Sequence, residues 1–138
     1  MQGGTSRPKP IKVIGNVREG NLALQPSTVV LVVVAALHVG FFILESVLWT
    51  SPMVRRMFET TKEEAQATRV LALNQGFYNL GAAVLLVWFH TTSNTEGVLG
   101  VLLFLVVMGI VGAITANWRI ILIQSLPALA ALLILSMG

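Results

Sequence analysis

Seven polar residues that lie inside otherwise apolar stretches have side chains that could support chemistry. They are His38, Glu45, Asn74, Gln75, Tyr78, Asn79 and Gln124. Imidazole and carboxyl groups can exchange protons, whereas amide and phenol groups can orient a ligand through hydrogen bonds. Because ionisable groups are costly in an apolar medium, these residues are the main functional signal of the sequence.

The spacing of these residues predicts that several of them meet. Glu45, Asn74 and Gln124 each lie five residues from the same end of their apolar stretches, which is a depth of roughly 7–8 Å at the rise of a helix. His38 lies seven residues before Glu45, so the two side chains fall within about 20° on one helix face, with His38 deeper. We therefore expect a polar cleft that opens at one membrane surface and ends near mid-membrane.

Two interpretations of this pattern stay open. In the first, Glu45 and His38 are the titratable groups of a ligand or ion site, and the amide and phenol groups orient the ligand. This interpretation assigns no catalytic residue and no metal site. In the second, the asparagine, glutamine and tyrosine side chains only hydrogen-bond neighbouring helices. A carboxylate is a costly way to join helices, so we favour the ligand site for Glu45.

The composition places these residues in a membrane. Hydrophobic residues make up 55% of the 138 residues and charged residues only 11%, against about 25% charged residues in soluble domains. The charges flank the apolar stretches instead of forming a basic patch, so no nucleic-acid partner is expected. The chain has no cysteine, which excludes thiolate zinc sites and iron–sulfur clusters.

The two histidines do not suit a shared haem. His38 and His90 lie on different apolar stretches, and their depths differ by on the order of 13 Å at the rise of a helix. A haem held by two histidines needs both ligands at one depth. We therefore expect no cofactor.

Four apolar stretches are long enough to cross a membrane, at residues 28–50, 69–90, 97–116 and 120–137, since a span needs about 20 apolar residues. All three tryptophans fall at the ends of these stretches, as in an aromatic belt. These features predict an all-α fold, a four-helix transmembrane bundle of residues 28–138. We interpret residues 1–27 as a polar, flexible or partner-bound N-terminal tail.

The distribution of charge gives the bundle an orientation in a cell membrane. Five positive residues lie on the side that contains segment 51–69 and Arg119, and none lies in segment 91–96 or at the C-terminus. The N-terminal tail, which is on the second side, has four positive residues, but only Lys12 and Arg18 lie near the membrane. The positive-inside rule then places both termini outside, in a multi-pass protein whose solvent is the lipid bilayer.

The loop between the first two spans contains two local patterns. Thr61 and Glu64 match a capping box, which predicts that the second helix begins directly after Thr61 and then enters the membrane. The segment 52–59 predicts a short helix at the membrane surface, with Met53 and Met57 facing lipid and its two arginines facing headgroups.

The last two spans contain signals for packing and bending. Gly109, Gly112, Ala113 and Ala116 form a stripe of small residues, which predicts close contact with another helix. Pro127 lacks a backbone N–H, so it predicts a kink in the fourth helix.

Several of these residues also occur in patterns typical of one family. The patterns are His38 and Glu45 with Leu48-Trp49-Thr50, the block Ala72-x-Asn74-Gln75-Gly76-x-Tyr78-Asn79, and Gln124-x-x-Pro127. Over about residues 28–138 the chain resembles the domain of unknown function 1304 family, small four-span membrane proteins found mainly in bacteria. The resemblance implies the four-span fold and a bacterial membrane and points to the same polar residues. It implies no activity, and the N-terminal tail departs from it.

The favoured function is non-enzymatic: the binding of a small molecule, lipid headgroup or ion in the polar cleft. An alternative is an accessory subunit of a larger membrane complex, and the chain could also form a homo-oligomer. A third alternative is a trimeric membrane enzyme of the glutathione type, which rests on the four-span size and on Arg69 and Asn74. The additional basic residues that such enzymes use for glutathione are not evident.

Overall fold

The computed structural model describes residues 25–137, and this part of the chain is all-α. Its helices are α1 (Pro26–Phe42), η1 (Ile43–Val47), α2 (Pro52–Met57), α3 (Lys62–Ala67), α4 (Arg69–Thr91), α5 (Thr95–Thr115), η2 (Ile121–Ser125) and α6 (Leu126–Met137). The segments η1 and η2 are π-helical turns that continue α1 and lead into α6. The tail predicted at residues 1–27 lies outside the described residues except at its last three positions.

All four predicted spans are helical. Three of them, Pro26–Val47, Arg69–Thr91 and Thr95–Thr115, are long and apolar enough to cross a membrane. The fourth, Ile121–Met137, is shorter and lies near the lower limit of about 17 residues for a span. The predicted all-α fold with four apolar helices is therefore confirmed.

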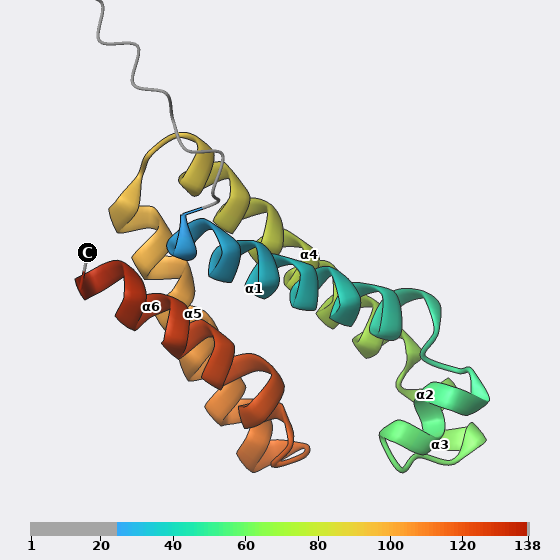
Figure 1. The fold of residues 1–138 in the computed structure, drawn as a ribbon. Helices are drawn as coiled ribbons and strands as arrows, with labels where there is room; N and C mark the ends of the chain where they lie inside the picture. The colour runs from blue at the N-terminus through green and yellow to red at the C-terminus, as the bar shows by residue number, and fades with distance from the viewer. Residues whose placement is uncertain (1–24, 138) are drawn as a thin grey trace, which may run out of the picture.

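The long helices pack as two pairs (Figure 1). Helix α1 lies along α4, and α5 lies along α6. The two pairs meet near the connection between α4 and α5 and diverge toward the opposite end, where α2 and α3 lie (Figure 1).

The apolar core lies where the two pairs meet. It contains Leu31, Val34, Ala35, Ala82, Ala83, Leu86, Val98, Leu102, Leu105, Ala128 and Ala131. Lipid chains are as apolar as these side chains, so helix association in a membrane depends on close packing more than on the hydrophobic effect. The alanines in this core suit that requirement because they let the helix backbones approach one another.

The capping box predicted in the first loop is present, but the helix that it starts is short. Thr61 Oγ1 accepts from the Glu64 backbone N–H at 3.1 Å, and Glu64 Oε2 accepts from the Thr61 N–H at 2.8 Å. The hydrogen bonds from the Thr61 backbone and hydroxyl hold the pKa of the Glu64 carboxyl below its usual value.

The prediction of one continuous second helix is wrong, because the chain breaks at Thr68 between α3 and α4. The Thr68 hydroxyl donates to the Glu64 carbonyl at 2.8 Å and accepts from Trp49 Nε1–H at 3.1 Å. A threonine hydroxyl that bonds the preceding turn bends a helix, and here the tryptophan from the first span holds it in place.

In both π-helical turns a backbone N–H donates to the carbonyl five residues earlier, instead of four residues earlier as in an α-helix. In η1 the Leu48 N–H donates to the Ile43 carbonyl at 3.0 Å. In η2 the Leu126 N–H donates to the Ile121 carbonyl, directly before Pro127, which has no N–H to continue the regular ladder. The structure thus has a π-helical turn directly before Pro127, and the kink predicted there stays a prediction.

Each helix pair is joined by a serine that packs against a glycine. Ser46 of η1 lies against Gly76 of α4, and Ser125 of η2 lies against Gly109 of α5, where a β-carbon on either glycine would overlap the serine Oγ. Each serine hydroxyl donates to the carbonyl three residues before its glycine, at 3.3 Å in the first pair and 3.0 Å in the second. We call these contacts the first and second joints. The close packing predicted at Gly109 is thus present within the chain.

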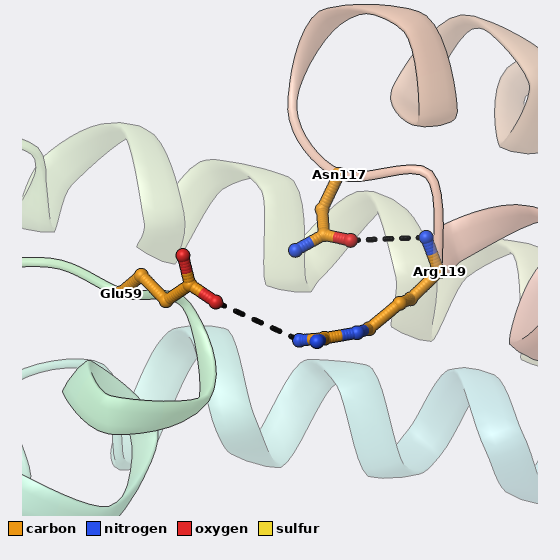
Figure 2. Close-up of polar contacts among 3 residues, drawn as sticks. All are labelled: Glu59, Asn117 and Arg119. Carbon is orange, nitrogen blue, oxygen red and sulfur yellow. Dashed lines mark hydrogen bonds and ion pairs between the residues drawn. The ribbon is translucent and has the colours of Figure 1, made fainter.

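An ion pair connects the diverging ends of the two helix pairs. Arg119 Nη1 lies 3.7 Å from Glu59 Oε1, and Asn117 Oδ1 accepts from the Arg119 backbone N–H at 2.9 Å (Figure 2). The side chains of Arg119 and Glu59 are 59% and 75% exposed. Exposed ion pairs contribute little to stability, so this contact holds the two ends together only weakly.

Candidate functional site

The candidate site is a carboxyl–amide pair beside the first joint. Asn79 Nδ2–H donates to Glu45 Oε2 at 2.7 Å. Glu45 lies in η1 next to Ser46, and Asn79 lies three residues after Gly76 on α4. Because Gly76 has no side chain, η1 approaches α4 closely enough for this short bond. Asn79 is buried and Glu45 is half-buried, so the pair lies at the edge of the packed region.

The pair leaves two oxygen atoms without a protein partner. Glu45 Oε1 and Asn79 Oδ1 accept no hydrogen bond from any described residue, and neither atom is enclosed. An amide oxygen is an acceptor, and an ionised carboxylate has acceptors only. Asn79 Nδ2 also keeps a second N–H, but the other free atoms of the pair are acceptors, so the pair suits a group that brings hydrogen-bond donors or positive charge.

His38, in α1 seven residues before Glu45, supplies a third unpartnered acceptor. Its side chain is 1% exposed, and its Nδ1 lies 2.8 Å from the Val34 carbonyl. Because a carbonyl only accepts, Nδ1 carries the proton and Nε2 presents a lone pair. Nε2 is buried and has no partner within residues 25–137. The ring also packs edge-on against Phe41, with centroids 5.5 Å apart.

Three of the predicted site residues, Asn74, Gln75 and Tyr78, are exposed. The buried face of α4 includes Ala72 and Asn79 and repeats every three or four residues, so Asn74 lies about 200° around the helix from Ala72 and points away from the pair. Gln75 lies four residues before Asn79 and about 40° from it around the helix. Among the described residues, no hydrogen bond joins any of these three side chains to Glu45 or Asn79.

Glu45 bonds Asn79 and not Asn74, although Asn74 was expected at its depth. The prediction used height along the helix, and it did not include the direction in which each side chain points. Asn79 is deeper by five residues on α4, yet it lies on the face that packs against η1.

Tyr78 lies instead in an apolar groove between α4 and α5. The groove has a volume of about 580 Å3, and Phe77, Leu85, Phe89 and Phe104 are among the side chains that line it. Neither Glu45 nor Asn79 lines this groove. The groove is therefore a separate, apolar surface feature and does not include the polar pair.

Gln124 belongs to the second joint. Its Nε2–H donates to the Leu105 carbonyl of α5 at 3.4 Å, and its side chain is half-buried. The bond stays within the α5–α6 pair, and no hydrogen bond among the described residues connects Gln124 with Glu45. The amide thus contributes to helix packing, which was the alternative interpretation of the polar pattern.

The chemistry of the site follows from its free atoms. In the part of the chain that the structure describes, no group of three His, Asp or Glu side chains gathers as a metal ion would require. Two oxygen acceptors and one deeper ring nitrogen can hold a proton, an ammonium group or a neutral donor. Sequence reasoning did not identify Ser46 and Gly76, which position Glu45 and Asn79. A signal was present, because Glu45-Ser46 in the first span has a counterpart in Gln124-Ser125 of the fourth.

Four apolar helices, three of them long and apolar enough to cross a membrane, and a polar pair at an internal joint indicate a small membrane protein. Residues 32–136 match the family described as "Protein of unknown function (DUF1304)". The chain belongs to this family, as the patterns around Glu45 and Asn74 predict.

A curated relative supports this assignment. The chain is 31% identical over 111 residues to the "Uncharacterized protein YpaA" of Lactococcus lactis subsp. lactis (strain IL1403). The match covers 77% of this chain and 93% of the relative. No solved structure matches the chain.

Proposed function

We propose that this protein binds a small amine or other hydrogen-bond donor within the membrane, at Glu45 and Asn79, with His38 as a further acceptor. The observation that carries the proposal is the 2.7 Å bond from Asn79 Nδ2 to Glu45 Oε2. That bond joins the two side chains and leaves Glu45 Oε1 and Asn79 Oδ1 as free acceptors for the ligand.

The free atoms favour a cation over an anion. A protonated amine carries several N–H donors and a positive charge, and it can bridge Glu45 Oε1 and Asn79 Oδ1. Hydrogen bonds to charged groups are stronger than neutral ones, and low local dielectric strengthens them further. A phosphate group would instead face a carboxylate and an amide oxygen, both of which repel it. The free atoms therefore favour a small molecule, headgroup or ion that is cationic or brings hydrogen-bond donors over one that is anionic.

Helix packing alone does not explain why the first joint carries a carboxyl group. Gln124 occupies the corresponding position in the second joint and bonds a backbone carbonyl without any ionisable group. A glutamine at position 45 would serve packing equally well and avoid the cost of a carboxylate at membrane depth. This comparison supports a role in binding for Glu45.

The proposed site is closer to one membrane surface than to the other. Glu45 lies in η1, directly before the segment with α2 and α3, where Arg55, Arg56, Lys62 and Arg69 are concentrated. By the positive-inside rule we infer that this end faces the cytoplasm and that both chain termini face outward, in a bacterial cell membrane.

The experiment uses the full chain in lipid nanodiscs and isothermal titration calorimetry. The probes are butylamine, tetramethylammonium and sodium phosphate. We expect butylamine to bind best, tetramethylammonium to bind more weakly because it has no N–H, and phosphate not to bind at the pair. Glu45→Gln should lower butylamine affinity by about tenfold or more, because hydrogen bonds to charged groups contribute roughly 1.5–3 kcal/mol.

The matched control is Glu96→Gln, which removes an exposed acid at the start of α5 and should leave butylamine binding unchanged. Asn79→Ala is the second variant, and circular dichroism verifies that both site variants remain folded. Butylamine affinity that is equal in the wild type, Glu45→Gln and Asn79→Ala would overturn the proposal.

A further inference from the structure

A second polar region lies in the loop that follows the first span. Pro52, Arg55, Arg56, Glu59 and Thr60 line a hollow of about 420 Å3 beside α2. These residues are distinct from the Glu45–Asn79 pair, and two of the five carry guanidinium groups. The region therefore offers the opposite chemistry, with donors in place of acceptors.

The two guanidinium groups of this hollow are held in different ways. Arg56 Nε–H donates to the Pro52 carbonyl at 3.2 Å, which fixes the side chain against α2. Arg55 Nε is buried and has no acceptor among residues 25–137. A buried N–H of a charged group is costly without an acceptor. The hollow thus favours an occupant that brings anionic oxygen atoms, which guanidinium groups bind strongly.

Glu59 is the acidic residue at the rim of the hollow, and a ligand can displace it easily. Its carboxylate lies 3.7 Å from Arg119 Nη1 (Figure 2), and both side chains are mostly exposed. Exposed ion pairs are weak, so an incoming anion can replace Glu59 as the partner of Arg119. Glu59 also has a φ of 56°, a left-handed conformation that is uncommon outside glycine. Asparagine adopts this conformation more readily than most residues, so it can replace glutamate at position 59.

The position of α2 indicates where the anion comes from. Helix α2 follows directly after the first span, and its Met53 and Met57 are about half exposed, at 51% and 50%. Trp49, at the end of that span, packs on Phe58 with ring centroids 5.2 Å apart. Tryptophan at a span end and a short amphipathic helix are typical of the headgroup layer of a membrane. The anions concentrated at that level are lipid phosphates.

We propose that this hollow binds a phosphate-ester anion, with Arg55 and Arg56 as its main partners and Arg119 joining when Glu59 moves aside. An anionic phospholipid and a soluble phosphate ester present the same oxygen atoms, and the interfacial position favours the lipid. The site is independent of the amine site, so its failure would leave the proposal for Glu45 and Asn79 intact.

The experiment measures lipid binding to the full chain by native mass spectrometry. The purified protein in mild detergent is titrated with short-chain phosphatidylglycerol, with phosphatidylcholine, and in a separate arm with glycerol 3-phosphate. Arg55→Gln and Arg56→Gln should each lower phosphatidylglycerol affinity by about tenfold or more, because each loses charge-assisted hydrogen bonds. Glu59→Asn tolerates the left-handed backbone, removes the competing carboxylate, and should raise the affinity.

Lys62→Gln is the matched control, because it removes one exposed positive charge at the start of α3, outside the hollow. General attraction to the membrane surface predicts a loss of no more than about fivefold for this variant. If Arg55→Gln does not fold, Arg55→Lys keeps the charge and removes the planar fork, and should still weaken binding.

Arginine-dependent binding of glycerol 3-phosphate in place of the lipid would support the phosphate site and assign it a soluble ligand. Phosphatidylglycerol binding that is unchanged in both arginine variants would overturn the proposal. Equal losses in the arginine variants and in Lys62→Gln would overturn it as well, because they would show attraction to charge without a site.

Discussion

The first and second joints are built alike and differ in one functional group. In both, a serine in a π-helical turn packs on a glycine of the neighbouring helix and donates to the carbonyl three residues before that glycine. In both, a longer polar residue precedes the serine: Glu45 before Ser46, and Gln124 before Ser125. The glutamine bonds a backbone carbonyl, whereas the glutamate bonds the side chain of Asn79 and keeps one oxygen free.

This difference separates packing from binding. The second joint shows that a serine, a glycine and a neutral amide are sufficient to close a pair of helices in this protein. The carboxyl group of Glu45 is therefore additional to what the joint requires, and so is the pairing with Asn79. Polar residues in membrane helices serve both purposes, and under the proposed function each joint serves one of them.

The largest expected effect tests whether the two joints are equivalent. Gly76→Ala and Gly109→Ala should each destabilise the protein by about 1–3 kcal/mol, the usual cost of overpacking, because the new β-carbon overlaps a serine in both joints. Gly40→Ala is the control, since no atom lies within 4 Å of its added β-carbon. It should be neutral or stabilising by up to about 1 kcal/mol, as in an ordinary helix. Unfolding of the protein in mixed detergent micelles provides the free energies.

Equal unfolding free energies for Gly76→Ala and Gly40→Ala would mean that the first joint is not closely packed. A loss at Gly109 alone would show that the second joint is packed and the first is not. The comparison between the two joints would then have no structural basis.

A smaller effect separates the joints by function. Ser46→Ala and Ser125→Ala should each cost about 0.6 kcal/mol, the mean contribution of a hydrogen bond between membrane helices. Only Ser46→Ala should also weaken butylamine binding, because Ser46 helps to hold η1, and with it Glu45, against α4. Unfolding and calorimetric titration of the two variants provide both quantities. If Ser125→Ala weakens butylamine binding as much as Ser46→Ala does, the two joints do not have separate roles.

The smallest effect concerns the segments that connect the two helices of each pair. The segment between α1 and α4 contains the capping box of Thr61 and Glu64, and the segment between α5 and α6 contains none. Hydrogen bonds from Thr61 lower the pKa of the Glu64 carboxyl in the folded protein. A lowered pKa stabilises the fold above the unfolded value of about 4.3, and the contribution is lost as the pH falls through the folded value. The thermal midpoint should therefore decrease slightly as the pH falls from about 5 to about 3, a range that includes the unfolded-state pKa of about 4.3.

Glu64→Ala should remove this part of the pH dependence, whereas Glu63→Ala, which alters an exposed acid in the same turn, should preserve it. Identical pH profiles for the wild type and Glu64→Ala would contradict the role assigned to the capping box.

Much of the fold could be predicted from the sequence because its causes are local. A long apolar stretch in a membrane must satisfy its own backbone hydrogen bonds, so it forms a helix whatever surrounds it. The capping box at Thr61 and Glu64 is likewise contained in four consecutive residues. The break at Thr68 could not be predicted in this way, because it depends on Trp49, a side chain from the turn between η1 and α2.

The candidate site was predicted only in part, for a geometric reason. The cost of a carboxyl group at membrane depth identified Glu45, and its spacing from His38 placed the two on one face. The partner of Glu45 could not be identified, because depth is readable from residue number but the rotation of one helix relative to another is not. Gly76 determines that rotation, since η1 can approach α4 only where no side chain intervenes.

The most direct test of the account is the contact between Glu45 and Asn79 in a bilayer. Solid-state nuclear magnetic resonance can measure the dipolar coupling between the 15N of the Asn79 side chain and the 13C of the Glu45 carboxyl group. A donor–acceptor distance of 2.7 Å predicts a measurable coupling, which should persist when butylamine is added, because the ligand binds the free oxygens Glu45 Oε1 and Asn79 Oδ1. No measurable coupling in the ligand-free protein would contradict the account, because Glu45 and Asn79 would then not form the pair on which the proposed site depends.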